Sequence, residues 1–259
     1  MCSTCGCGTD DARVEHEHAP PDHDHGHDEH ERTHTVELEQ AVLARNDHLA
    51  QHNRDWLASQ DIPAYNLMSS PGAGKTTLLE RTVAACARQV SVIEGDQETV
   101  FDADRIRAAG ARAVQVNTGA GCHLDAGMVH RALDKLQPEP GGVVFIENVG
   151  NLVCPALFDL GELAKVVIIS VTEGDDKPLK YPHMFAAADL VVLNKTDLLP
   201  YVDFDTRRLV ADARRLNPGV TVLPLSARTG EGLDAWLGWL GSSASVGFRP
   251  DVRTATPLT

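Results

Sequence analysis

A glycine-rich loop between a predicted strand and a predicted helix constrains this chain more than any other feature. The stretch from Ser69 to Thr76 reads SSPGAGKT, follows the apolar run YNLMS and opens the helical pattern TTLLERTVAACAR. Gly72 and Gly74 let backbone N–H groups approach an anion closely, and the following helix adds the positive end of its dipole. This order of strand, loop and helix predicts a phosphate-binding loop.

Individual side chains of the loop have expected roles. Lys75 would reach the β- and γ-phosphates as a catalytic group, the Thr76 hydroxyl would hold Mg²⁺, and Thr77 could contact the α-phosphate. Ser69 stands where such loops usually begin with glycine, which affects the first turn and not the phosphate cradle. The alternative is an ordinary glycine-rich turn. The expected nucleotide contacts in the loop are Ser70, Gly72, Ala73, Gly74, Lys75, Thr76 and Thr77.

A second motif predicts which base is bound. NKTD, from Asn194 to Asp197, follows the apolar run DLVVL. The Asp197 carboxylate can accept two hydrogen bonds from guanine N1–H and its 2-amino group, and adenine offers neither. Asn194 and the stem of Lys195 would brace the loop and the base. After the next strand, backbone N–H groups at Ser226 and Ala227 could donate to guanine O6, which also favours guanine.

The middle of the chain supplies candidate magnesium ligands. ENVG, from Glu147 to Gly150, stands where a nucleotide switch is expected, and an earlier strand ends in EGD at Asp96. Asp96 or Glu147 could hold Mg²⁺ directly or through water and so serve catalysis, with an ordinary polar strand end as the alternative. No glutamine is obviously placed to orient the attacking water and no arginine finger is evident, so hydrolysis should be slow.

Strands and helices alternate from Ile62 to about Leu240, and seven apolar runs are separated mostly by helical patterns. This alternation predicts an α/β protein, a three-layer P-loop NTPase fold with a mostly parallel sheet of about seven strands covered on both faces. The expected domains are a disordered Cys/His-rich metal-binding tail at 1–35, an amphipathic helix at 36–60, a GTPase domain at 61–242 and a disordered tail at 243–259.

Charge and cysteine usage limit the class of protein. Net charge is -14, from 23 basic and 37 acidic residues, which argues against a general nucleic-acid binder. No stretch approaches the roughly 20 apolar residues of a membrane span, and no signal peptide is recognisable. We therefore expect a cytoplasmic protein with reduced thiols, in which six cysteines suggest metal or redox chemistry.

The N-terminal segment resembles a metal-binding tail. Cys2, Cys5 and Cys7, with the α-amino group, could supply four ligands, and square-planar N/S coordination would favour Ni²⁺ whereas tetrahedral coordination would favour Zn²⁺. A run of histidines among acidic residues predicts a metal store. A redox-idle or merely solvated tail is the alternative. The histidines are His16, His18, His23, His25, His27, His30 and His34.

Three further residues could bind a soft or borderline metal within the predicted domain. Cys122 and His123 are adjacent, and Cys154 follows ENVG by four residues. Thiolate and imidazole suit Zn²⁺ or Ni²⁺, and three ligands are one short of a closed tetrahedral site, which a two-fold dimer could complete or double. The alternative is two small buried cysteines and a capping histidine.

The stretches SSPGAGKTTLLERT, VIEGDQET, QVNTGAGCHLDA, FIENVGNLVCPA, SVTEGDDKPLKYPHMF and LNKTDLLPY together resemble the hydrogenase nickel-incorporation GTPases, the HypB family. The resemblance implies a dimerising P-loop GTPase in which Cys122, His123 and Cys154 form a metal site at the dimer interface. It implies that GTP binding is coupled to dimerisation and to metal handling. Some members carry a similar CxxCxC start, which implies a tight nickel site in the tail.

The expected function is therefore a GTP-hydrolysing metallochaperone that delivers Ni²⁺ to the large-subunit precursor of a [NiFe]-hydrogenase. Expected cofactors are GTP, Mg²⁺ and Ni²⁺, with Zn²⁺ as an alternative metal. Expected partners are a second copy of the chain, the hydrogenase precursor and other maturation proteins, including a nickel-binding one. The alternatives are a regulatory GTPase, a nickel or zinc storage protein, and a urease-type nickel chaperone.

Overall fold

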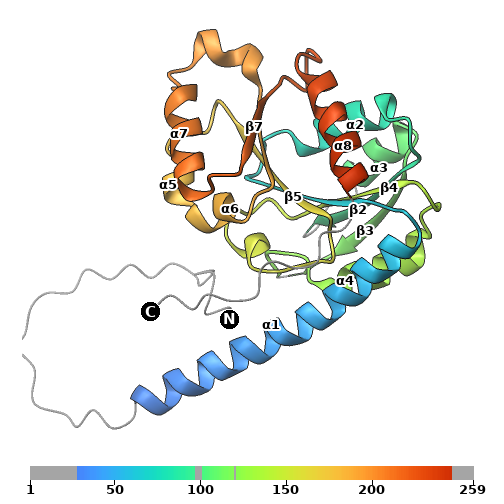
Figure 1. The fold of residues 1–259 in the computed structure, drawn as a ribbon, viewed down its shortest axis with the longest axis vertical. Coiled ribbons are helices and arrows are strands. Elements are labelled where there is room, and N and C mark those ends of the chain that lie inside the picture. The colour runs from blue at the N-terminus through green and yellow to red at the C-terminus, as the bar shows by residue number, and fades with distance from the viewer. Residues whose placement is uncertain (1–27, 97–100, 120, 247–259) are drawn as a thin grey trace, which may run out of the picture. The chain divides into compact units, whose positions relative to one another are not determined.

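The computed structural model describes residues 28–96, 101–119 and 121–246. Within them lies a seven-stranded parallel sheet in the order β3-β2-β4-β1-β5-β6-β7 (Figure 1). The predicted α/β fold with a parallel sheet is confirmed. The strands are β1 (Ala64–Ser69), β2 (Val90–Asp96), β3 (Arg112–Asn117), β4 (Val143–Glu147), β5 (Ala164–Ser170), β6 (Leu190–Asn194) and β7 (Thr221–Pro224).

Helices connect the strands and cover the sheet. The α-helices are α1 (Asp28–Ser59), α2 (Lys75–Ala85), α3 (Phe101–Ala108), α4 (Ala126–Leu136), α5 (Lys177–Lys180), α6 (Pro182–Ala186), α7 (Thr206–Leu216) and α8 (Leu233–Val246). Two 3₁₀ turns, η1 (Cys154–Ala156) and η2 (Thr196–Tyr201), lie in the connections. The compact unit that contains the sheet begins at Asn46, within α1.

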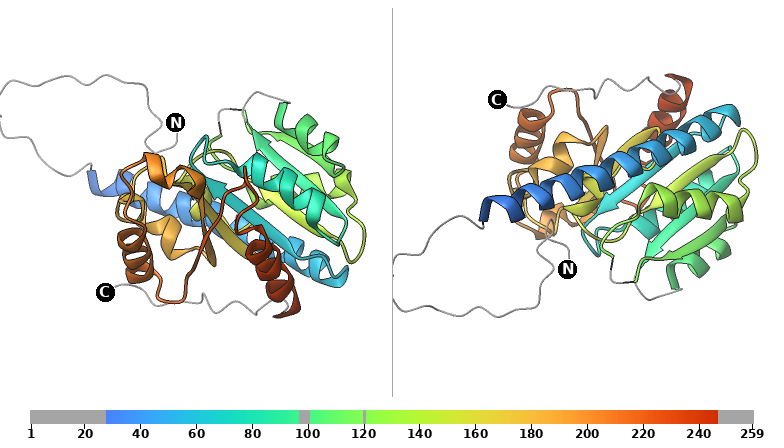
Figure 2. Two further views of the ribbon diagram at one scale, coloured as in Figure 1. Left: turned by 90° about the horizontal axis from the view of Figure 1, so that it is seen from above. Right: turned by 90° about the horizontal axis from the view of Figure 1, so that it is seen from below.

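Both faces of the sheet are buried, which explains the near-continuous apolar strands. Successive side chains of a strand point to opposite faces. On β1, Tyr65 and Leu67 pack in one cluster with residues of α2, α3 and α8, whereas Ala64 packs with α4 and Leu57 of α1 on the other face. The half of that face near β5 and β6 is covered by α6 and α7. Figure 2 shows the sheet between the two helix layers.

Element limits differ from expectation at both ends. Helix α1 begins at Asp28, eight residues before its expected start at 36, and acidic residues at the beginning of DEHE suit the positive end of a helix. Helix α8 continues to Val246, past the expected domain limit at 242. Cys2, Cys5, Cys7 and the histidines from His16 to His27 lie outside the described residues. None of the described helices has the length and apolar character that crossing a membrane requires.

Candidate nucleotide and metal sites

The glycine-rich loop adopts the backbone that its sequence predicts. Gly72 and Gly74 have φ of 75° and 98°, in the left-handed region that favours glycine. A Cβ on Gly74 would lie 2.5 Å from Asn194 Nδ2, so the loop also needs glycine for its close approach to the base-side segment. Lys75 Nζ donates to Ser69 Oγ at 2.8 Å, and burial lowers the pKa of Lys75 although nearby acids, Glu147 first, oppose this.

The phosphate loop contains one side-chain hydroxyl, that of Ser70, that is buried and makes no hydrogen bond with any residue described in the structure. A buried polar atom of this kind costs free energy unless something binds it. Together with the left-handed glycines and the buried Lys75 amine, this orphan hydroxyl fits a loop built to hold phosphate oxygens.

The Thr76 hydroxyl donates to Glu147 Oε1 at 2.8 Å, which joins the start of α2 to the end of β4. The second oxygen of Glu147, Oε2, is buried and has no hydrogen-bond partner among the residues that the structure describes. Burial raises the pKa of Glu147, while Lys75 and the Thr76 bond oppose the rise. A hydroxyl and an unsatisfied carboxylate side by side are the oxygen ligands that Mg²⁺ prefers. Asp96 ends the neighbouring strand β2, at the same end of the sheet as Glu147.

A third carboxyl, that of Glu94, lies at the same edge and received no role from the sequence. Glu94 on β2 is the register neighbour of Glu147 on β4. Its side chain is buried, and within the described part of the chain Oε2 has no hydrogen-bond partner. Burial, followed by repulsion from Glu147, Asp102 and Asp96, raises the pKa of Glu94 to about 8. The phosphate side therefore gathers carboxyl groups whose burial and mutual repulsion disfavour the ionised form, and a nearby divalent cation would favour that form.

The base-side motifs form a network of hydrogen bonds with the phosphate loop. Asn194 Nδ2 donates to the Ala73 carbonyl at 2.8 Å, and Asn194 Oδ1 accepts from the Ala227 N–H at 3.0 Å. Lys195, with φ of 62°, extends its Nζ to the Gly72 carbonyl at 2.7 Å. Asn194 and Lys195 thus tie the end of β6 to the phosphate loop, as the sequence predicted for a bracing role.

The predicted guanine-reading residue lies within the same network. Asp197 Oδ1 accepts a hydrogen bond from the Ser226 hydroxyl at 2.6 Å, and Oδ2 lies 4.0 Å from Arg228 Nη1. Arg81 on α2 fixes the loop after β7 by donating to the carbonyls of Ala227 and Arg228 at 3.2 and 2.9 Å. Asp197, Ser226 and Ala227 are therefore held as one unit, and Arg81 is a support that no sequence motif indicated.

The three predicted metal ligands of the core come together. The ligand atoms of Cys122, His123 and Cys154 all lie within 4.8 Å of one another. The sulfurs of Cys122 and Cys154 lie 2.7 Å apart, and Cys122 Sγ lies 3.6 Å from His123 Nδ1. The His123 ring stacks on Phe158, with centroids 3.9 Å apart. Burial lowers the pKa of His123, which favours the neutral imidazole that a metal requires.

Asn148 connects the phosphate side to the metal-ligand side. Its Oδ1 accepts from the backbone N–H of Leu124 at 3.2 Å, next to His123, and its Nδ2 donates to Asn66 Oδ1 at 3.2 Å. Glu147, one residue earlier, accepts a hydrogen bond from Thr76 at the phosphate loop. Since successive side chains of an extended chain alternate, Glu147 and Asn148 point to opposite faces of the sheet. Two consecutive residues therefore contact the two candidate sites, one each.

The structure places the predicted residues in two groups. The phosphate loop, Asp96, Glu147, the NKTD motif and the Ser226–Ala227 pair surround one edge of the sheet. Cys122, His123 and Cys154 form a separate cluster. Nothing in the sequence indicated Phe158, whose ring stacks on His123. The contacts of Glu94 and Asn148 could not be predicted either, because they depend on strands that come together only in the fold.

Comparison with known proteins agrees with this geometry. The family described as "CobW/HypB/UreG, nucleotide-binding domain" matches residues 63–224. The chain is 50% identical to "Hydrogenase maturation factor HypB" of Azotobacter chroococcum, over 93% of this chain and 92% of that protein. It is 58% identical to the protein of the same name from Rhizobium leguminosarum bv. viciae, over 81% and 71%.

A solved structure is similar as well. HypB from Helicobacter pylori, crystallised in complex with nickel, superimposes with a TM-score of 0.77 at 36% identity, covering 82% of this chain and 99% of that one. The chain therefore belongs to the CobW/HypB/UreG family and, within it, to the HypB hydrogenase maturation factors, which makes it a GTPase.

Proposed function

We propose that this GTPase is a nickel metallochaperone that helps insert Ni²⁺ into the large subunit of a [NiFe]-hydrogenase. The observation that carries the proposal is the connection from the phosphate loop to the thiol cluster. Thr76 bonds Glu147, and Asn148 bonds the backbone beside His123. The printed name of the relatives supports the hydrogenase role, and the nickel complex of the Helicobacter pylori protein supports the cargo.

In this proposal the nucleotide is held as the sequence suggested. The phosphates lie on the backbone of the loop and on Lys75, and guanine lies against Asp197. Thr76, Glu147 and Asp96 hold Mg²⁺, which neutralises charge on the phosphates during hydrolysis. The buried, unsatisfied oxygen of Glu147 supports this assignment. Hydrolysis is slow because no side chain of the motifs supplies the water-orienting glutamine of faster relatives.

Nucleotide exchange acts on the metal through the segment after β4. A ligand at Glu147 changes the position of this carboxylate, and Asn148 transmits the change to Leu124 while Cys154 follows in the same segment. Such a local charge change biases a switch when the two states differ in contacts. We infer that Cys122, His123 and Cys154 bind Ni²⁺ with an affinity that depends on the nucleotide, and that Zn²⁺ competes for the same thiolates.

Three ligands leave a coordination position for a second copy of the chain, so we propose a GTP-dependent homodimer with the cluster at its interface. The tail at 1–35 binds metal through Cys2, Cys5 and Cys7 and stores it on histidines, ahead of the GTPase domain at 61–242. The hydrogenase precursor and a nickel-binding maturation protein are the proposed partners, in the cytoplasm.

The test is nickel binding to the full chain with GDP or with a non-hydrolysable GTP analogue, while molecular mass is followed. Replacing Cys2, Cys5 and Cys7 with serine gives a background in which Ni²⁺–thiolate absorption reports the remaining thiols. We expect the absorption and its nucleotide dependence to be lost in Cys154→Ala. They should be kept in Cys86→Ala, a matched control for a free thiol outside the cluster.

The outcomes separate the proposal from its alternatives. A Cys154→Ala variant with intact nickel affinity and intact nucleotide dependence would leave a guanine-nucleotide switch with a metal-binding tail. GTP turnover that ignores nickel would indicate a regulatory GTPase. Nickel binding without any turnover would indicate a store.

A further inference from the structure

Two asparagines on α1 contact the segments that carry the metal ligands. Asn46 and Asn53 are seven residues apart, which is about two helical turns, so they lie on one face of α1. Asn53 is fully buried and Asn46 nearly so. Neither lies within the residues 63–224 that match the family domain. Buried amides on an otherwise ordinary helix require hydrogen-bond partners, and the partners are informative.

Asn46 joins two separate loops with its one side chain. Its Oδ1 accepts from the backbone N–H of Ala126 at 2.9 Å, and its Nδ2 donates to the carbonyl of Asp159 at 2.8 Å. Ala126 lies three residues after His123, and Asp159 lies five residues after Cys154. The amide therefore bridges the segment of one ligand pair to the segment of the third ligand.

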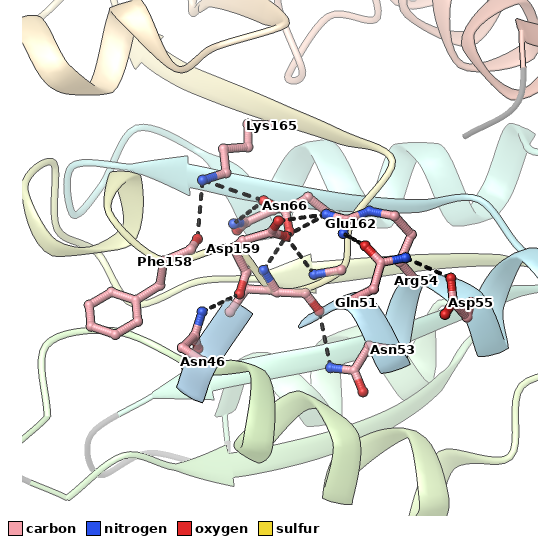
Figure 3. Close-up of polar contacts among 12 residues, drawn as sticks. Asn46, Gln51, Asn53, Arg54, Asp55, Asn66, Phe158, Asp159, Glu162 and Lys165 are labelled. Carbon is pink, nitrogen blue, oxygen red and sulfur yellow. Dashed lines mark hydrogen bonds and ion pairs between the residues drawn. The ribbon is translucent and has the colours of Figure 1, made fainter. Parts of the chain in front are cut away.

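Asn53 repeats the same bridge two turns later. Its Nδ2 donates to the carbonyls of Ala126 at 2.9 Å and Leu160 at 3.1 Å. Its Oδ1 lies 3.2 Å from His130 Nδ1 on α4. Figure 3 shows Asn46 and Asn53 on α1 beside the segment of Asp159 and Glu162. Both amides thus connect the same two stretches of backbone.

The segment after Cys154 is pressed closely against α1. A Cβ on Gly161, whose φ is 88°, would lie 2.5 Å from the Ala50 carbonyl and 2.9 Å from the Arg54 N–H. Arg54 Nη2 also contacts both oxygens of Asp159 at 2.7 and 2.6 Å. A glycine at this point allows the contact that brings the asparagines within reach of both loops.

The same segment is held from the sheet side. Lys165 Nζ, buried in β5, donates to the carbonyl of Ala156 at 3.3 Å and to that of Phe158 at 3.1 Å. Figure 3 shows the bond to Phe158. Phe158 stacks on the ring of His123. The stretch from Ala156 to Leu160, which follows Cys154, is therefore held from two sides, and α1 provides the side that also contacts Ala126, three residues after His123.

We propose that Asn46 and Asn53 are positioning residues of the metal site, which clamp the Cys122–His123 segment to the Cys154 segment and so set the spacing of the three ligands. This inference rests on the proposed function of the cluster as a nickel site. It makes α1 a working part of that site. Because an asparagine side chain both donates and accepts, one amide can hold a backbone N–H and a carbonyl at once, which neither aspartate nor leucine can do.

The experiment measures Ni²⁺ binding to the full chain in the background with Cys2, Cys5 and Cys7 replaced by serine. Variants are Asn46→Ala, Asn53→Ala and the double variant. The control is Gln51→Ala, an exposed amide whose two hydrogen bonds, to Asp55 and from Arg54, stay within the same helix. The readouts are Ni²⁺ affinity, the energy and intensity of the Ni²⁺–thiolate absorption, and GTP-analogue affinity.

We expect Ni²⁺ affinity to fall about 10- to 100-fold in the double variant, the usual loss when the partners that orient ligands are removed. The thiolate absorption should shift because the ligand spacing is no longer fixed. GTP-analogue affinity and the Gln51→Ala control should stay within about twofold of the parent, since neither involves the clamp.

A purely structural role gives a different result. If the asparagines serve stability alone, Tm falls while Ni²⁺ affinity and absorption stay as in the parent, and the proposal is overturned. Should the double variant not fold, Asn46→Ala alone decides, through the rise in Tm that Ni²⁺ causes over the same variant without metal. Binding that is weaker gives a smaller rise. An equal rise in parent and variant overturns the clamp.

Failure of the clamp and failure of the proposed function can be told apart. A parent whose thiolate absorption survives Cys122→Ala and Cys154→Ala has no nickel site in the cluster, and both proposals fall. A parent that loses the absorption in those variants but not in the asparagine variants keeps its nickel site and loses only the clamp.

Discussion

The nucleotide side and the metal side of this molecule are built in different ways. At the nucleotide side, residues within short motifs bond one another, as when Asn194 contacts Ala73 and Lys195 contacts Gly72. At the proposed metal side, the candidate ligands come from two segments that are connected by residues distant in the sequence, such as Asn53. A site made from motifs can be predicted from sequence, and we expect substitutions outside the motifs to affect its ligand affinity little. A site made from loops depends on its supports.

The largest expected effect lies within the nucleotide motifs. Asp197→Ala removes two charge-assisted hydrogen bonds to guanine, so GTP affinity should fall by about 10²- to 10⁴-fold. Titration with a fluorescent GTP analogue measures this. Asp203→Ala, which removes an exposed carboxylate six residues on, is the matched control. Unchanged GTP affinity in Asp197→Ala would contradict the base-reading role, and changed nickel affinity would contradict the independence of the two sides.

The next effect tests whether the metal side depends on buried supports. Lys165 Nζ lies 3.6 Å from Glu162 Oε1, and both side chains are buried. Lys165→Met therefore leaves Glu162 buried without its cationic partner. It also removes the hydrogen bonds to the carbonyls of Ala156 and Phe158. Breaking a buried ion pair typically costs about 3–5 kcal/mol in free energy of unfolding. Urea unfolding measures the loss.

Adding Glu162→Gln to Lys165→Met should recover part of it, because the uncompensated charge is then gone. The control is Lys180→Met, which breaks an exposed ion pair with Asp176 and should change stability little. Equal losses in the two lysine variants would show that the buried pair is no special support.

A third test uses pH at the nucleotide side. The Glu94 carboxyl titrates near 4.5 in the unfolded chain and at about 8 in the fold. Between these values the folded protein binds one proton more, so its free energy of unfolding falls as pH rises, by at most about 1.4 kcal/mol per pH unit. The contribution is complete below pH 4.5 and is lost as pH rises through 8.

Glu94→Gln should therefore flatten the pH dependence of stability, measured by urea unfolding at several pH values without Mg²⁺ or nucleotide. Glu139→Gln, in the exposed loop after α4, is the matched control. A Glu94→Gln variant with the slope of the parent would mean that Glu94 is ionised in the fold.

The smallest expected effect concerns a support of the nucleotide side. Arg81→Ala removes two bonds that hold the loop of Ala227 and Arg228, and at about 1 kcal/mol for each bond only part is transmitted to the base. We expect the Kd for GTP to rise about three- to tenfold, with nickel affinity unchanged. The control is Arg215→Ala, an exposed arginine at the end of α7. A larger loss of GTP affinity in Arg81→Ala than in Asp197→Ala would show that the nucleotide side, too, depends mainly on its supports.

The fold and the nucleotide motifs could be predicted from sequence because their signals are local. Seven apolar runs correspond to seven strands, and the order of glycine-rich loop and NKTD places both at the same edge of the sheet. The short helices α5 and α6 were not predicted, because KPLKYPHMFA contains two prolines and few turns of helical period. The early start of α1 was missed because its first turns have no apolar face.

The metal ligands were predicted from residue type and from a family resemblance, and the structure brings them together. Their supports were not predictable. Asn46, Asn53 and Asn148 are isolated polar residues whose hydrogen-bond partners lie tens of residues away in the sequence. Asn46 and Asp159, for example, are 113 positions apart. Glu94 became informative only when the register of β2 and β4 placed it beside Glu147. Such contacts arise from the tertiary fold and leave no periodic trace.

The alternation of Glu147 and Asn148 has a consequence for protein engineering. Because neighbouring residues of an extended chain point to opposite faces, adding one residue between them would send the amide to the phosphates and the next side chain to the thiols. The number of residues between Glu147 and Asn148 is therefore more tightly constrained than the identity of either residue. A one-residue insertion at this point is therefore the shortest change that would disturb the proposed connection between nucleotide and metal while keeping every residue of both candidate sites in the sequence.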